Sequence, residues 1–186
     1  IVGMLLFNEQ VVYTAQVQST ATETFEELRA FFEHPKLIKR VKEIKAAIGR
    51  EQIILHTGAR IKFLSRTRVS GRGKHGDLLV FDEAQELDET QQASWLPALA
   101  ASRNPQTLYL GTPPPPETKG TVFRELRDKI IGGNTSNASW FEFSVDKIGN
   151  IKDKTRWYVT NPALGRRILE NTVATESEQM PEDTFA

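Results

Sequence analysis

The sequence predicts an α/β domain of three layers around a mainly parallel β-sheet. The apolar run at 78–81 is typical of a strand that is buried on both faces. Segments rich in β-branched and aromatic residues alternate with segments of helical apolar spacing, as they do in βαβ units. Several of the predicted strands end in polar residues, at the edge where open parallel sheets place their ligands. A length of 186 residues suits one domain with a buried core.

The first part of the chain is predicted to contain a strand between helical segments. Residues 1–7 read as the end of a helix, and 11–17 as a strand rich in β-branched and aromatic residues. A helix is expected from Ser19 to the helix breaker Pro35. A second helix is expected over 36–48, because apolar residues recur there at helical intervals, at Leu37, Val41, Ile44 and Ile48.

The remaining elements complete the alternation. A β-hairpin is predicted from the two apolar segments that flank Thr57-Gly58-Ala59, and a basic, glycine-rich loop follows it over 66–76. Beyond that loop the expected elements are, in order, a strand, a helix, a strand, a helix and a strand: 77–82, 89–101, 107–110, 119–131 and 140–145. The acidic and polar tail from Thr172 onward reads as a linker.

Composition narrows the classes of protein that the chain could represent. Lys plus Arg and Asp plus Glu both total 24, so net charge neither favours nor excludes a nucleic-acid partner. The absence of cysteine excludes a disulfide framework and a thiolate zinc site. No apolar run is long enough to span a membrane. The basic segments 36–50 and 60–74 and the acidic segment 82–89 are compatible with a phosphate-handling surface, although a solvated charged helix also explains 36–50.

Asp82 and Glu83 directly follow the predicted buried strand, which is the layout of a Walker B element. In such a site Asp82 would hold Mg²⁺ through its water shell, and Glu83 would orient and deprotonate the water that attacks a γ-phosphate. The alternative is structural, because either carboxylate could cap the next helix and stabilise its dipole. An apolar run followed by Asp-Glu is common, so the neighbouring motifs decide between the two interpretations.

Several motifs occur in a fixed order along the chain. They are Ser65–Gly73, Gly76–Leu87, Leu96-Pro97, Asn104–Gln106, Leu110–Pro114 and Thr160–Gly165. The ordered set resembles the ATPase domain of phage terminase large subunits, the motors that package DNA into the heads of tailed phages. The resemblance implies a P-loop NTPase fold of the RecA/ASCE-like type, with ATP and Mg²⁺ as cofactors. It also implies an ATP hydrolase that couples hydrolysis to the translocation of double-stranded DNA into a prohead.

The resemblance also implies roles for two further motifs. Arg72 would be an arginine finger that stabilises γ-phosphate charge on the neighbouring subunit of a ring, with Arg66 and Arg68 as rivals for that role. An ordinary solvated basic loop is the alternative. The coupling motif that would sense the γ-phosphate is Gly111, Thr112 and Pro113. A tight turn after a strand explains these three residues equally well.

The partners implied by the resemblance are double-stranded DNA, a terminase small subunit and a portal protein, with a homo-oligomeric ring as the assembled form. The implied location is the host cytoplasm during virion assembly, with no membrane involved. The sequence departs from the family in two respects. It has no glycine-rich, lysine-containing phosphate loop ahead of the strand near Val11, since Gly73-Lys74 follows no strand, and it has no RNase H-like nuclease.

These departures lead us to expect a piece of a longer protein. Residues 1–160 would be a partial ATPase domain, and 161–186 a linker toward a nuclease domain. We expect the 186-residue chain to be inactive by itself, because the phosphate loop supplies most phosphate contacts. Two alternatives stay open at this point. One is a fragment of a helicase-like DExx ATPase, and the other is a non-catalytic interaction module that has lost its nucleotide site.

Overall fold

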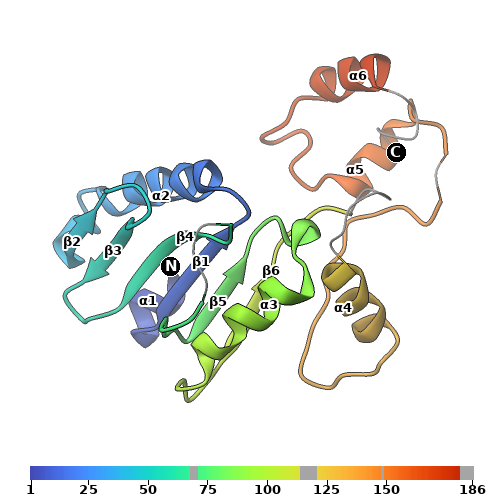
Figure 1. The fold of residues 1–186 in the computed structure, drawn as a ribbon. Helices are drawn as coiled ribbons and strands as arrows, with labels where there is room; N and C mark the ends of the chain where they lie inside the picture. Colours follow the sequence, from blue (N-terminus) through green and yellow to red (C-terminus); the bar gives the residue numbers. More distant parts are fainter. Residues whose placement is uncertain (68–70, 114–120, 148, 181–186) are drawn as a thin grey trace. The chain divides into compact units, whose positions relative to one another are not determined.

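The computed structural model describes residues 1–67, 71–113, 121–147 and 149–180. Contacts divide the chain into two compact units, Ile1–Thr135 and Ser136–Ala186. The first unit contains the whole sheet and the second contains two short helices (Figure 1). The expected division into a partial ATPase domain over 1–160 and a linker over 161–186 toward a further domain stays a prediction.

The first unit is built on a six-stranded sheet with the strand order β2-β3-β4-β1-β5-β6 (Figure 1). The strands are β1 (Gln10–Ala15), β2 (Val41–Lys45), β3 (Gln52–Leu55), β4 (Arg60–Ser65), β5 (Leu78–Phe81) and β6 (Gln106–Tyr109). Strands β4, β1, β5 and β6 are mutually parallel, whereas β3 and β2 continue the sheet in antiparallel fashion. The predicted mainly parallel α/β fold is therefore confirmed, and the hairpin predicted over the two segments that form β3 and β4 is present.

Strand β5, which precedes Asp82, lies inside the sheet between β1 and β6. Its register pairs Tyr13 with Val80 on one side and Phe81 with Tyr109 on the other. Because the strands are parallel, the polar residues that follow β1, β5 and β6 all lie at one edge of the sheet. This is the arrangement that the sequence predicts.

The described residues of the first unit form four α-helices. They are α1 (Val2–Phe7), α2 (Gln18–Phe32), α3 (Glu89–Trp95) and α4 (Thr121–Ile131). Helix α2 confirms the helix expected after Ser19, and it buries Ala21, Phe25 and Phe32, which recur at helical spacing. Phe31, which belongs to the same apolar pattern in the sequence, is exposed. Helix α3 begins with a capping box in which Asp88 accepts from the main-chain N–H of Gln91.

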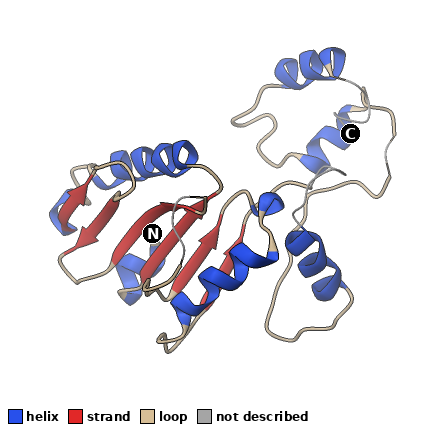
Figure 2. Ribbon diagram, viewed as in Figure 1, coloured by secondary structure: helices blue, strands red, loops and turns tan. Residues whose placement is uncertain are grey.

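Side chains alternate between the two faces of the sheet, and helices cover both (Figure 2). On one face Phe63 contacts Tyr13 and Phe25, with ring centroids 5.5 Å apart in each pair. Leu79 and Phe81 have the opposite parity to Val80, the partner of Tyr13, so they point to the other face. Both are fully buried, and the 3₁₀ helix η3 (Leu96–Leu99) contacts β5. The domain thus has the three layers that were predicted.

The prediction of a helix over 36–48 is wrong. The chain forms the short 3₁₀ helix η1 (Ile38–Arg40) and then strand β2. A β-bulge between Val41 and Glu43 adds one residue to β2, and both Val41 and Ile44 pack against the core. The bulge therefore brings residues three apart to the same face, as a helix does. Ile48, the last member of the supposed stripe, is exposed.

Two further expectations need correction. The helix expected over 89–101 ends at Trp95 and is followed by η3, which contains Pro97, a residue with no N–H to donate. The strand expected over 140–145 is not formed, since the structure assigns no strand to these described residues. Its alternating aromatic side chains are exposed, Phe141 at 87% and Phe143 at 61%. Alternation predicts a strand, but a strand also needs a neighbour to accept its main-chain hydrogen bonds.

The second unit is small and has its own core. Its helices are α5 (Lys154–Thr160) and α6 (Glu170–Gln179), and α6 occupies most of the tail that reads as a linker. Trp157, Leu164 and Val173 form its buried cluster. Among the described residues of either unit, no helix has the length and apolarity needed to cross a membrane.

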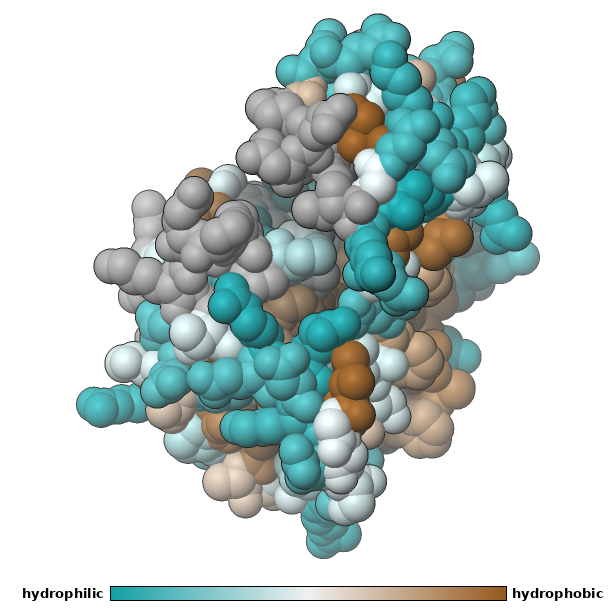
Figure 3. All heavy atoms as spheres, turned by 90° about the vertical axis from the view of Figure 1, so that its right-hand side faces the viewer, coloured by the Kyte–Doolittle hydropathy of each residue, from teal (hydrophilic) through white to brown (hydrophobic). Residues whose placement is uncertain are grey.

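Large apolar side chains are exposed in both units, for example Phe7 of α1 and Leu169 ahead of α6. Figure 3 shows one face of the molecule coloured by hydropathy. On that face the most hydrophobic residues lie singly or in small groups among hydrophilic ones. Scattered exposure of this kind is normal for a protein surface.

Candidate functional site

The candidate site lies at the carboxyl edge of the parallel strands. Gln16 follows β1, Arg66 follows β4, Asp82 and Glu83 follow β5, and Gly111 lies just beyond β6. The sequence predicted the convergence of the first, third and fourth of these strand ends. Strand β4, the second in this list, adds Arg66, whose place in the site the sequence did not show.

Asp82 is held in a defined orientation by β1. Its main-chain N–H donates to the carbonyl of Thr14 at 2.8 Å, which prolongs the pairing of β1 with β5. Its carboxylate accepts from the hydroxyl of Tyr13 and from the N–H of Glu83, the latter at 2.9 Å. The Tyr13 hydroxyl lies 3.0 Å from Oγ1 of Thr24 in α2. A chain of polar contacts therefore links the Asp82 carboxylate to α2.

Burial raises the pKa of Tyr13 above its ordinary value, and the hydrogen bond to Asp82 raises it further. The neutral hydroxyl is the form that the fold stabilises. Because the folded pKa is the higher one, this contribution to stability is complete below the unfolded pKa of about 10 and is lost progressively as the pH rises above it.

We therefore expect the free energy of unfolding of the chain to fall more steeply between pH 9 and pH 11 than that of Tyr13→Phe, which has no proton to lose. Urea unfolding at the two pH values measures this difference. Tyr109→Phe is the matched control, since burial raises the pKa of Tyr109 as well but its hydroxyl faces the neutral Gln92. Equal slopes for the unmodified chain and Tyr13→Phe would contradict the assigned Tyr13–Asp82 contact.

Glu83 has a left-handed backbone, with φ 51° and ψ 47°, which is uncommon for a residue other than glycine. This conformation carries its carboxylate back toward β1, where Oε2 accepts from the main-chain N–H of Gln16 at 3.2 Å. Helix α3 is capped by Asp88 and not by either carboxylate. Glu83 directly precedes the 3₁₀ helix η2 (Ala84–Glu86), but its side chain makes no capping hydrogen bond there. Strained backbone persists where the surroundings impose it, commonly at functional sites.

Arg66 is buried, with an exposed fraction of 5%, and lies between the ends of β1 and β5. Its Nη1 donates to the carbonyls of Thr14 at 2.9 Å and Asp82 at 2.7 Å, and its Nη2 donates to the carbonyl of Glu83 at 3.2 Å. Burial lowers the pKa of Arg66, while the carboxylates of Glu83 and Asp82 oppose that shift. A side chain buried in this way cannot reach a neighbouring subunit, so Arg66 is removed from the rivals for the arginine finger.

The other two arginines of the loop differ from Arg66. Arg72 is exposed, in the turn that leads toward β5, and Arg68 lies outside the described residues. Gly71, immediately before Arg72, is buried against α3. A Cβ atom on Gly71 would lie 2.5 Å from Cα of Trp95 and 2.6 Å from the carbonyl oxygen of Ser94. The close approach to α3 therefore requires glycine and sets the position from which Arg72 projects.

Gly71→Ala is expected to destabilise the chain by about 1–3 kcal/mol, because the added methyl group meets main-chain atoms of α3 that cannot move aside independently. Arg72→Ala changes an exposed side chain in the same loop and should stay within about 0.5 kcal/mol of the unmodified chain. Urea unfolding of the three proteins measures both effects. A Gly71→Ala variant as stable as the Arg72→Ala variant would show that the loop does not pack on α3 in this way.

The predicted coupling motif contacts the segment that carries Asp82 and Glu83 through Gln85, a residue that sequence reasoning missed. The N–H of Thr112 donates to Oε1 of Gln85 at 3.3 Å, and the N–H of Ala84 donates to the carbonyl of Leu110 at 2.8 Å. Gly111 approaches the same side chain, since a Cβ atom there would lie 2.6 Å from the Gln85 oxygen. Gln85 directly follows the Asp-Glu-Ala run, which is the signal that could have identified it.

The residues at this edge fit a Mg²⁺ ion whose ligands are mainly water molecules and substrate phosphates. No group of three or more His, Cys, Asp or Glu residues that could enclose a metal is found among the described residues. Mg²⁺ needs no such cage, because it is commonly held by one or two carboxylates together with water and substrate phosphates. The side-chain Oε1 of Gln16 is buried and has no partner among the described residues, so it could accept from a metal-bound water.

The chain's Gly-Lys step does not provide a phosphate loop. The N–H of Lys74 donates to the carbonyl of Gly71 in a tight turn, and Gly73 has a φ of 70°. The turn leads into strand β5 and not into a helix, whereas a phosphate loop opens a helix whose N–H groups face the phosphates. The turn at Gly73-Lys74 is therefore not a phosphate cradle of this type.

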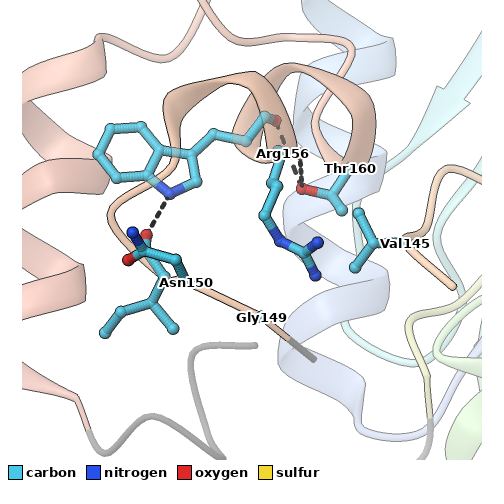
Figure 4. A pocket seen from close by; sticks show the side chains of 7 residues that line it. Val145, Gly149, Asn150, Arg156 and Thr160 are labelled. Atoms are coloured by element: carbon cyan, nitrogen blue, oxygen red, sulfur yellow. Dashed lines mark hydrogen bonds between the residues drawn. The ribbon is translucent and has the colours of Figure 1, made fainter. Parts of the chain in front are cut away.

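A pocket in the second unit does not belong to this site. Figure 4 shows Val145, Gly149, Asn150, Arg156 and Thr160 around it. Its volume is about 40 Å³, which is room for a few water molecules and far too little for a nucleotide. Trp157 and Ile151 also line the pocket, and the indole N–H of Trp157 donates to the main-chain carbonyl of Ile151 at 2.6 Å.

No known protein-family model matches the sequence, and no curated protein matches it. Among solved structures, the chain is similar to the large terminase of bacteriophage HK97, with a TM-score of 0.80 and 22% sequence identity. The similarity covers 96% of this chain and 38% of the HK97 chain, so this chain spans well under half the length of that protein. This chain therefore shares the fold of part of the large terminase of bacteriophage HK97.

Proposed function

We propose that the chain forms part of the ATPase motor of a phage terminase large subunit, which couples ATP hydrolysis to the translocation of double-stranded DNA into a prohead. The observation that carries the proposal is the Asp82–Glu83 pair at the carboxyl end of an internal parallel strand, with both side chains oriented by β1. The fold shared with the HK97 large terminase supports the same assignment. The resemblance of the ordered sequence motifs to that family adds to it.

In this proposal Asp82 holds Mg²⁺, which when bound would neutralise charge on the β- and γ-phosphates of ATP. Tyr13 keeps the Asp82 carboxylate turned toward the edge of the sheet by donating its hydroxyl proton. Glu83 accepts the proton of the attacking water and orients that water for displacement at the γ-phosphate. The N–H of Gln16 is the resting partner of the Glu83 carboxylate and releases it when the water is in place.

Arg72 acts on a neighbouring subunit in the proposed assembly. Its exposed position, on a loop fixed by Gly71 against α3, is what an arginine supplied in trans requires. The coupling motif responds to phosphate loss through Gln85, which bridges Thr112 to the segment that carries Glu83. Movement of either carboxylate would thereby be transmitted to the chain beyond β6.

The assembled motor in this proposal is a homo-oligomeric ring that works with a terminase small subunit, a portal protein and double-stranded DNA. It acts in the host cytoplasm while virions assemble and needs no membrane. Each of these partners follows from the proposed function and can be tested separately.

The first test uses the 186-residue chain and a longer protein that contains it together with a phosphate loop. We expect no measurable Mg²⁺-dependent ATP hydrolysis by the chain alone and DNA-stimulated hydrolysis by the longer protein, because phosphate contacts come mainly from the missing loop. A phosphate-release assay with and without linear double-stranded DNA measures both. Robust turnover by the chain alone would show that its nucleotide contacts have been misassigned, and a longer protein that hydrolyses no ATP would refute the proposed function.

A non-catalytic interaction module is the second candidate, and the lack of a phosphate loop among the described residues favours it. A fragment of a helicase-like DExx ATPase shares the Asp-Glu chemistry and would differ in its substrate. The same assay separates them, because a module shows no hydrolysis in any context. A helicase would be stimulated by single-stranded DNA or RNA in preference to the duplex.

A further inference from the structure

Arg66 is a buried cation whose shorter hydrogen bonds go to main-chain carbonyls, while Nη1 also donates to the side-chain Oγ1 of Thr14 at 3.4 Å. Its Nη1 and Nη2 donate to the carbonyl groups of Thr14, Asp82 and Glu83, and its carbon Cζ lies 6.0 Å from the centre of the Phe81 ring. The described structure assigns it no ion pair with either neighbouring carboxylate. A guanidinium buried without a salt bridge is unusual, since buried charges are normally paired.

Two of the three carbonyls, those of Asp82 and Glu83, lie just after β5, on either side of the Cα atom of Glu83. The carbonyl of Asp82 precedes the Cα of Glu83 and the carbonyl of Glu83 follows it, so their orientations are set by the φ and ψ angles of Glu83. Those angles are the left-handed pair 51° and 47°. A planar guanidinium has donors in a fixed fork, and the fork of Arg66 holds both carbonyls in the orientation that this strained backbone requires.

The third carbonyl, that of Thr14, connects the Arg66 guanidinium to β1, and the residue after β1, Gln16, binds the Glu83 side chain. Arg66 donates to the carbonyl of Thr14 in β1, and its own N–H donates to the carbonyl of Ala15 at 2.9 Å. The next residue of that strand, Gln16, supplies the N–H that the Glu83 carboxylate accepts. Arg66 therefore sets the distance between the backbone of Glu83 and the partner of its side chain.

We propose that Arg66 is a positioning residue that holds the Asp82–Glu83 main chain in its left-handed bend and thereby aims the Glu83 carboxylate. It touches no reacting atom in this proposal and acts only through the carbonyls. Its effect on turnover rests on the proposed ATPase function, whereas its effect on the backbone does not. The two can be measured independently.

The backbone effect is tested on the 186-residue chain with Arg66→Lys, which keeps the charge but lacks the planar fork. We expect the amide hydrogen of Gln16 to exchange at least about tenfold faster in Arg66→Lys, while the amide of Val12, in the middle of the same strand, changes by less than about twofold. Arg72→Lys is the matched control, because it makes the same change at an exposed arginine in the same loop and should alter neither amide. Hydrogen exchange followed by NMR gives the rates residue by residue.

Two results of that experiment would overturn the proposal. One is an unchanged Gln16 exchange rate in folded Arg66→Lys. The other is uniform acceleration across β1 and β4, which would mean that Arg66 only contributes to general stability. Should Arg66→Lys not fold, the unmodified chain decides: the guanidinium hydrogens of Arg66 should give separate, slowly exchanging signals, and a single averaged signal would refute the assigned contacts.

The effect on turnover is tested in the longer protein that contains a phosphate loop. Arg66→Lys should lower kcat by at least about tenfold and leave the KM for ATP within about twofold, because the carboxylate is misaligned while the phosphate contacts remain. A rise in KM with unchanged kcat would contradict a positioning role. If the unmodified longer protein hydrolyses no ATP, the proposed function fails, and the exchange rates still decide the role of Arg66.

Discussion

Replacing Glu83 with glutamine in the longer protein should reduce ATP turnover by about 10²- to 10⁴-fold, the contribution usual for a general base. Glutamine has nearly the same size and can still accept from the N–H of Gln16, but it cannot take a proton from water. Nucleotide affinity should stay close to that of the unmodified protein. Steady-state phosphate release and equilibrium binding of a fluorescent ATP analogue measure the two quantities.

Two variants control this experiment. Glu86→Gln makes the same chemical change three residues further on, at an exposed side chain, and should leave turnover unchanged. Asp82→Asn should weaken Mg²⁺-dependent nucleotide binding, because it removes the proposed metal ligand. Near-normal turnover by Glu83→Gln would mean that its carboxylate serves only the fold and that another group activates the water.

The second large effect is expected for Arg72→Ala, which should lower turnover by about a thousandfold or more with little loss of nucleotide affinity. The side chain is exposed and its loop is held by Gly71, so its removal leaves the fold of its own subunit intact. Arg103→Ala is the matched control, since Arg103 is also exposed but precedes β6, at the opposite edge of the sheet.

Mixing two inactive variants tests whether Arg72 acts on a neighbouring subunit. Arg72→Ala retains its carboxylates and Glu83→Gln retains its arginine, so a shared interface can contain one complete site. We expect partial recovery of turnover in the mixture, measured after confirming by ultracentrifugation that the two proteins assemble. An assembled mixture with no recovery would rule out action in trans. An undiminished rate for Arg72→Ala alone would transfer the role to Arg68, because Arg66 is buried.

The parallel strands and the position of the carboxylates could be predicted because their signals are local. The apolar run at 78–81 is buried whatever pairs with it, and the residue after it must lie at the carboxyl edge of the sheet. Helix α2 was predictable for the same reason, since its apolar residues recur at a period that suits one buried face. The ordered motifs led from these elements to the fold that the chain shares with part of the HK97 large terminase.

Local spacing also explains the errors. The apolar spacing near residues 41–44 indicated a helix because a bulge in β2 gives residues three apart a common face. The aromatic alternation at 140–145 indicated a strand, although the structure assigns none to these described residues. In both cases the deciding fact was which segment lies alongside, and sequence periodicity does not contain that information.

The sequence by itself determined the parallel core and the residues at the end of β5, because burial and periodicity act within a few neighbouring positions. Only the tertiary structure decided what the basic loop residues do. Arg66 and Arg72 are the same residue type in the same basic segment of the sequence. Main-chain carbonyls surround the Arg66 side chain, whereas the Arg72 side chain faces solvent. The partners of Arg66 come from β1 and from the segment after β5, up to 52 residues away in the chain. Such contacts form only when the sheet brings the strand ends together, so they cannot be inferred from neighbouring residues.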